Sequence, residues 1–98
     1  MKPWPFSDPP NVATITVREI VDRKRPILLV CHDSEDGSWQ FLTGGAFDVA
    51  DGRVVGLKSM MDLDPSLLEL ADLPLGWQAS RDSKESPWRR SQIANEDA

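Results

Sequence analysis

A continuous apolar run at residues 27–31 (ILLVC) constrains the fold more than any other part of the sequence. The run is too short for a typical helix, so it predicts a strand that is buried on both faces. The acidic sequence HDSEDG follows at residues 32–37, and SWQFLT follows at residues 38–43. Trp39 and Phe41 in the second run point to one face of a strand. The three segments therefore predict an antiparallel hairpin with an Asp-Gly turn.

Shorter signals predict the remaining elements. Further strands are expected at residues 12–15, 53–57 and 76–81. A first short helix is expected from Thr16, whose spacing to Glu19 fits a capping box, to about Lys24. A second is expected from Asp64 as N-cap, with Pro65 at the first helical position. The fold class predicted is α+β: a small, mainly antiparallel sheet of three to five strands with two short helices.

Composition divides the 98-residue chain into three parts, with one compact domain between two tails. Residues 1–11 hold four prolines and predict an extended arm, anchored on the body by Trp4 and Phe6. Residues 12–81 are expected to form the single α+β domain. Residues 82–98 contain few apolar side chains and are expected to form a polar C-terminal tail, disordered at its end.

The charge pattern indicates which partners suit the chain. A net charge of −5 argues against nucleic acid, whose affinity comes largely from Lys and Arg. Residues 33–72 hold nine acidic and two basic side chains, which would suit a basic partner, although a solvated acidic surface is the simpler interpretation. No run approaches the roughly 20 apolar residues of a membrane helix, and the N-terminus lacks a signal peptide's apolar stretch. We therefore expect a cytoplasmic protein without membrane association.

The residues with catalytic or metal-binding chemistry do not form a recognisable site. The single cysteine, Cys31, cannot pair within the chain or build a zinc site. Cys31 and His32 are neighbours on a predicted strand and should point to opposite faces, and there is no second histidine. A calcium loop starting at Asp33 would need glycine and glutamate where Ser38 and Gly44 stand. We expect no catalytic residue, no metal and no cofactor.

Two segments have the composition of a protein-binding surface. One is the acidic turn between the hairpin strands, and the other is a tail segment that combines tryptophan with arginine, as interface hot spots do. The candidate partner-binding residues are Asp33, Glu35, Asp36, Trp88, Arg89 and Arg90. An equally good interpretation of Trp88 is that it folds back and pins the tail on the sheet.

The strand pair at residues 27–30 and 39–44 (WQFLTG), with the later stretch 72–79 (DLPLGWQA), carries a resemblance to known families. From residue 12 to 81 the chain resembles small bacterial families of unknown function, one of which is grouped with immunity proteins that neutralise polymorphic toxins. The resemblance implies an α+β fold, no enzymatic activity and a role in toxin neutralisation. It assigns no role to any residue.

Three hypotheses for function follow. The first is a non-catalytic protein-binding module, immunity-protein-like, that engages a basic partner. The second is a small-ligand-binding protein or minor enzyme with a cleft near His32. The third is a homodimeric structural protein, with an interface built from Trp88 and the N-terminal arm.

Overall fold

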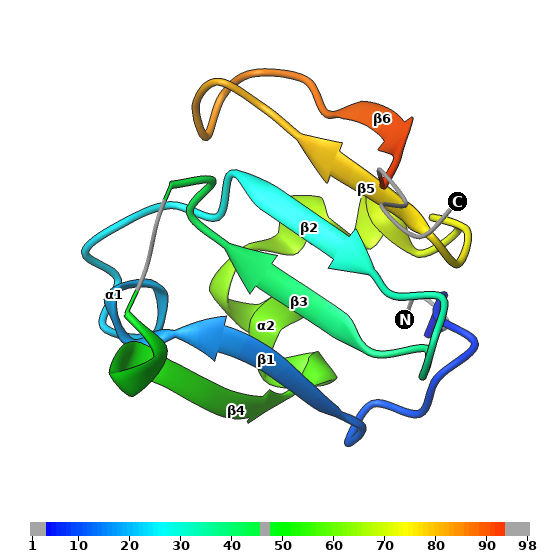
Figure 1. Cartoon of the computed structure of the whole chain (residues 1–98), viewed down its shortest axis with the longest axis horizontal. Coiled ribbons are helices and arrows are strands. Elements are labelled where there is room, and N and C mark those ends of the chain that lie inside the picture. Colours follow the sequence, from blue (N-terminus) through cyan, green and yellow to red (C-terminus); the bar gives the residue numbers. More distant parts are fainter. Residues whose placement is uncertain (1–3, 46–47, 94–98) are drawn as a thin grey trace.

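The computed structural model describes residues 4–45 and 48–93, which form an α+β fold around one sheet (Figure 1). The strands are β1 (Ala13–Val17), β2 (Leu29–His32), β3 (Trp39–Leu42), β4 (Gly52–Gly56), β5 (Trp77–Ser80) and β6 (Arg89–Gln92). Their spatial order is β4-β1-β3-β2-β5-β6. β1 and β3 are parallel, and the other neighbouring pairs are antiparallel. The predicted fold class is confirmed, but the sheet is mixed and has six strands rather than three to five.

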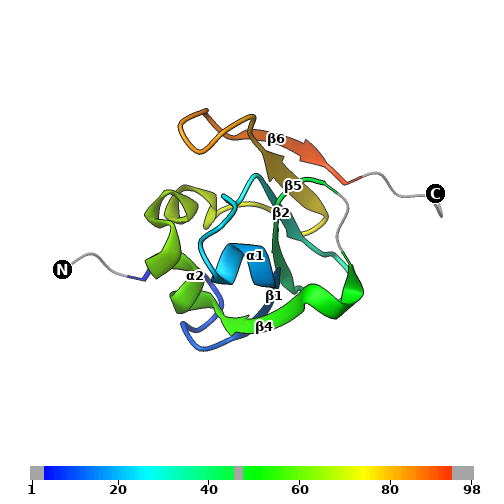
Figure 2. The ribbon, with the colours of Figure 1, turned by 90° about the vertical axis from the view of Figure 1, so that its left-hand side faces the viewer.

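Short helices cover one face of this sheet. They are α1 (Arg18–Val21), α2 (Leu57–Leu63) and the 3₁₀ helix η2 (Pro65–Leu70), while a further 3₁₀ turn, η1 (Val49–Asp51), leads into β4. Figure 2 shows α1 and α2 together on the same side of the strands. None of the helices in the described residues is long and apolar enough to cross a membrane.

The core lies between the covered face of the sheet and these helices. Its fully buried residues include Val30, Phe41 and Ala79 from the strands and Leu57, Met60, Leu67 and Leu70 from the helices. The other face carries a cross-strand row in register: Val54, Ile15, Gln40, Cys31 and Gln78. The alternation is incomplete: β1 buries Thr14 and Thr16 on the covered face, whereas Ile15 and Val54 lie exposed on the other face.

The predicted hairpin is confirmed. β2 and β3 pair antiparallel with Val30 opposite Phe41, and Gly37 adopts a φ of 73° in the connecting turn. Trp39 and Phe41 are both buried, on the covered face. The prediction that the first strand is buried on both faces was wrong: Val30 is buried, but Cys31 on the opposite face is only half-buried.

The predicted capping box at Thr16 and Glu19 was wrong. Thr16 lies inside β1, and its hydroxyl donates to the carbonyl of Phe41 at 2.8 Å. The helix α1 begins at Arg18 without a side-chain cap and ends at Val21, short of Lys24. β1 is paired on both sides, so its ladder and the burial of Thr16 outweigh the local helix signal.

The predicted N-cap at Asp64 was correct. Its carboxylate accepts a hydrogen bond from the backbone N–H of Ser66 at 3.0 Å, and Pro65 follows as the first helical residue. The helix that begins there is a 3₁₀ helix, η2, and α2 precedes it directly.

The two expected tails differ in outcome. Residues 4–11 lie against the body as an arm, with Phe6 buried and its ring 5.3 Å from that of Trp39. The polar tail expected over 82–98 instead contributes β6, which pairs with β5 along its whole length. All four residues of β6 are exposed, so backbone hydrogen bonds hold it and no apolar pattern predicted it. Residues 1–3 and 94–98 lie outside the described residues.

Candidate functional site

Cys31 and His32 do not form a nucleophile and base pair. The ring of His32 stacks on Trp39 with centroids 3.9 Å apart, and its Nδ1–H donates to the carbonyl of Leu73 at 2.8 Å. Cys31 lies on the opposite face of β2, as expected from strand alternation. Burial raises the pKa of its thiol, and the nearby charge of Asp33 raises it further. The thiolate that nucleophilic chemistry needs is therefore disfavoured at neutral pH.

The candidate acidic residues form a rigid turn. Asp33 accepts hydrogen bonds from the amide of Gln40 at 2.6 Å and the hydroxyl of Ser38 at 3.3 Å. Asp36 accepts one from the backbone N–H of Ser38 at 3.0 Å, and this bond lowers the pKa of Asp36. Glu35 and Asp36 are exposed, whereas Asp33 is half-buried. Asp33 thus holds the turn, and the other two acids present their charge to solvent.

An apolar side chain that sequence reasoning missed lies beside this turn. Leu75, in the loop between η2 and β5, is 55% exposed. Its Cδ2 would lie 3.9 Å from a Cβ built on Gly37, so the two loops are in contact. The backbone N–H of Gly76 also donates to the carbonyl of His32 at 2.7 Å. We call Glu35, Asp36 and Leu75 the acidic tip.

The second candidate segment contacts its own chain. Trp88 is half-buried, and the guanidinium of Arg81 lies over its ring, 4.0 Å from the centroid. The segment thus folds back on the body. The two arginines that follow form ion pairs: Arg89 with Asp82 at 2.9 Å and Arg90 with Asp72 at 2.8 Å.

The two candidate segments lie at opposite ends of the sheet. The acidic turn follows His32 at the end of β2, whereas Arg89 is opposite Ser80, which pairs with Leu29 at the start of β2. The structure does not bring them together into one surface, so each has to be judged separately as a binding site.

Arg81 anchors a buried polar network that the sequence did not reveal. Its side chain is 1% exposed, and Nη2 donates to Oδ2 of Asp64 at 2.6 Å. Nε donates to the carbonyl of Ile27 at 3.0 Å, and Nη1 donates to the hydroxyl of Ser66 and the carbonyl of Lys84. One guanidinium thereby joins the approach to β2, the start of η2 and the loop before β6. A single arginine just after a strand gives no sequence signal for such burial.

This network makes the free energy of unfolding depend on pH. Burial raises the pKa of Asp64, but hydrogen bonds from Ser66 and Arg81 and the arginine's charge outweigh it, so the pKa is lowered overall. Asp64 therefore stabilises the fold above the ordinary Asp pKa of about 3.9, and this contribution is lost as pH falls through the lowered value. We expect the free energy of unfolding, from urea titrations, to fall more steeply below pH 4 in wild type than in Asp64→Asn. Equal slopes would contradict this.

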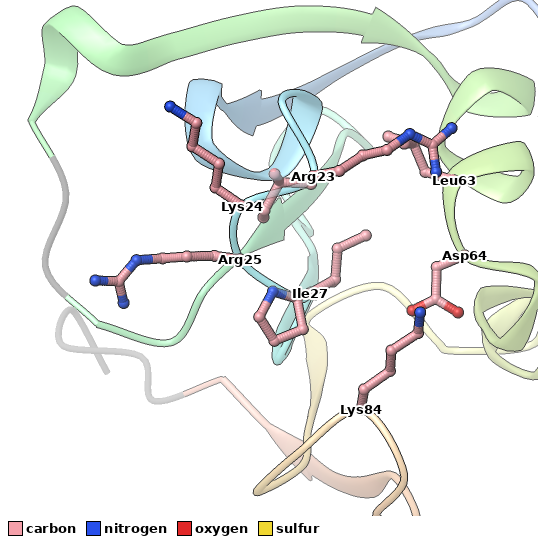
Figure 3. Close-up of a pocket in the computed structure, with 9 residues that line it drawn as sticks. Arg23, Lys24, Arg25, Ile27, Leu63, Asp64 and Lys84 are labelled. Atoms are coloured by element: carbon pink, nitrogen blue, oxygen red, sulfur yellow. The ribbon is translucent and has the colours of Figure 1, made fainter.

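A pocket of about 310 Å³ opens next to the network (Figure 3). Its apolar wall is formed by Ile20, Ile27 and Leu63, and Asp64 lies at one side. Four basic residues also line it: Arg23, Lys24, Arg25 and Lys84. We call it the basic pocket. His32 is not among its lining residues, so it is not the cleft expected near that histidine.

Comparisons of the chain with protein-family models, with curated proteins and with solved structures found no match. The resemblance to immunity-protein-like families therefore stays a prediction. The candidate sites have to be judged on their own geometry, and two of them present features that a partner or ligand can use: the acidic tip and the basic pocket.

Proposed function

We propose that this chain is a non-catalytic protein-binding module whose acidic tip docks on a basic surface of another protein. One observation carries the proposal: Leu75, 55% exposed, lies against Gly37 in the same turn that exposes Glu35 and Asp36. An apolar anchor surrounded by a charged rim is the usual anatomy of a protein interface. The rim charges would speed association with a basic partner and select against acidic ones.

The rigidity of the turn supports this assignment. Gly37 N–H donates to the carbonyl of Asp33 at 3.0 Å, and Asp33 N–H donates to the carbonyl of Ser38 at 2.9 Å. The side-chain bonds of Asp33 and Asp36 add to these backbone bonds. A loop that is already ordered before binding loses little conformational entropy in the complex, so more of the contact energy appears as affinity.

The structure offers less for the two alternative functions. His32, the centre of the proposed enzyme cleft, is stacked on Trp39 and hydrogen-bonded to Leu73. The residues proposed for a homodimer interface are largely used within the chain, since Phe6 is buried and Trp88 lies on Arg81. The resemblance to immunity proteins implies a toxin as partner, and a toxin with a basic surface would suit the charge of the acidic tip.

The test is affinity capture from the source organism with a tip variant, Glu35→Gln, Asp36→Asn and Leu75→Ala combined. We expect wild type to retain a specific protein that carries a basic surface patch, and the tip variant to lose at least nine-tenths of it. Both charge changes are at exposed positions, so the variant should unfold at nearly the wild-type urea concentration.

A matched control removes the same kinds of side chain elsewhere: Glu85→Gln, Asp62→Asn and Val49→Ala, all at exposed positions. This control should capture the partner as wild type does. Equal capture by wild type and the tip variant, or equal loss in the tip variant and the control, would contradict docking through the acidic tip.

A further inference from the structure

Among the described residues, four of the five basic side chains that form no ion pair gather at one place in the fold. All Lys and Arg residues except Lys2 lie in the described residues. Ion pairs with aspartates engage Arg18, Lys58, Arg81, Arg89 and Arg90. Arg53 donates to the carbonyls of Ala50 and Gly52. The four that remain, with no ion pair among residues 4–45 and 48–93, are Arg23, Lys24, Arg25 and Lys84, and all four line the basic pocket.

This concentration stands out in a chain whose net charge is −5. The one acidic residue in the pocket lining, Asp64, is already neutralised by Arg81 at 2.6 Å. Of the acidic residues that flank the lining in sequence, Asp62 is paired with Lys58 and Asp82 with Arg89, whereas Asp22 and Glu85 form no ion pair among the described residues. The lining therefore carries four cationic side chains against one paired carboxylate, and such a concentration of positive charge attracts anions.

The four basic side chains point in different directions relative to the pocket (Figure 3). Arg23 and Lys84 extend from opposite sides toward the part of the wall formed by Leu63 and Asp64. The charged ends of Lys24 and Arg25 point away from it. A bound anion would thus be held by Arg23 and Lys84, with the other two adding to the field at longer range.

The backbone at Arg23 gives a second, independent indication. The chain leaves α1 through two hydrogen bonds, from Lys24 N–H to the carbonyl of Glu19 at 2.8 Å and from Arg23 N–H to that of Ile20 at 3.0 Å. This is a Schellman motif, in which the residue in the position of Arg23 is left-handed and usually glycine. Arg23 has a φ of 62° and is the only non-glycine residue with positive φ in the described part of the chain. Strain of this kind is characteristic of functional positions.

From these observations we infer that the basic pocket binds a small organic phosphate, with the phosphoryl group held between Arg23 and Lys84. The guanidinium of arginine matches a phosphate in two-pronged geometry, and lysine adds a compact charge. A volume of about 310 Å³ is at the lower end of ligand pockets, so the ligand is small. Its apolar part would lie against Ile20, Ile27 and Leu63. The inference does not depend on the proposed protein partner.

The test is a titration of the ¹⁵N-labelled chain by NMR at low ionic strength, with three probes: inorganic phosphate, adenosine monophosphate and adenosine. We expect both phosphates to bind, with the largest shift changes at Arg23, Ile27 and Lys84, and adenosine to cause none. Tighter binding of adenosine monophosphate than of inorganic phosphate indicates an ester ligand, whereas equal affinity indicates that the phosphoryl group alone is recognised.

The binding variant combines Arg23→Gly with Lys84→Gln and should weaken phosphate binding at least tenfold. Because glycine removes the strain at position 23, Arg23→Gly alone should unfold at an equal or higher urea concentration than wild type. Loss of binding then cannot be attributed to loss of the fold. The matched control, Arg53→Gln with Lys58→Gln, removes the same charges outside the pocket and should bind as wild type does. No binding of either phosphate at 10 mM, or equal weakening in variant and control, would overturn the inference.

Discussion

Replacing Arg81 by methionine is expected to lower the free energy of unfolding by about 3–5 kcal/mol, because removing one partner leaves a buried charge uncompensated. Asp64, 7% exposed, would lose the guanidinium that lies 2.6 Å from its carboxylate. The carbonyl of Ile27 would lose its donor, and Trp88 would lose the cation over its ring. A domain of this size has roughly 5–15 kcal/mol in total, so the variant should lie close to the unfolding threshold.

Urea denaturation followed by circular dichroism measures this effect. The matched control is Arg89→Met, which breaks an arginine–aspartate pair with Asp82 that is exposed on both sides. Exposed pairs contribute about 0–1 kcal/mol, so the control should differ little from wild type. If Arg81→Met and Arg89→Met cost the same, the buried network does not hold the loop between β5 and β6. Arg81→Lys keeps the charge but not the fork and should fall between them.

The second large effect is expected at Trp39, where alanine should cost about 3–5 kcal/mol, as for other buried large aromatic residues. Trp39 is 2% exposed and lies between the ring of His32, at 3.9 Å, and the ring of Phe6, at 5.3 Å. Its indole N–H also donates to Oδ2 of Asp8 at 2.9 Å. The substitution removes the surface on which the N-terminal arm is anchored.

Two measurements separate the parts of this effect. Urea denaturation gives the total, and limited proteolysis reports release of the arm, whose cleavage near Asp8 should become much faster in Trp39→Ala. The control Trp39→Phe retains an aromatic ring but loses the hydrogen bond to Asp8. Loss of that bond should add only about 1 kcal/mol to the cost of the smaller ring. An arm as protected in Trp39→Ala as in wild type would show that it is anchored by other contacts.

The sequence predicted those parts of the fold in which local and long-range forces agree. The hairpin at β2 and β3 was predictable because an apolar run, an Asp-Gly turn and an alternating strand all favour the same pairing. The N-cap at Asp64 was predictable because its hydrogen bond is local: the carboxylate accepts from the backbone N–H of Ser66, two residues further along the chain. The predicted capping box at Thr16 was wrong because Thr16 belongs to β1, which pairs with two strands that are distant in sequence, β3 and β4.

The remaining features depend on neighbours that are distant in sequence. β6 has four exposed polar residues, and it is defined by its backbone pairing with β5 and by the ion pairs of Arg89 and Arg90. Of the acidic tip, Glu35 and Asp36 were predicted, but Leu75 joins them from a loop some 40 residues away, which no local pattern indicates. Arg23 and Arg25 follow α1 closely in sequence, but only the fold brings Lys84 to the same pocket.

The most direct test of docking through the acidic tip is the dissociation constant of the captured partner, measured by calorimetry for wild type, the tip variant and the matched control. Loss of an apolar anchor and two rim charges should weaken binding at least tenfold, about 1.4 kcal/mol or more. Docking through the acidic tip predicts this loss in the tip variant and wild-type affinity in the control. Equal affinities in all three proteins would contradict it.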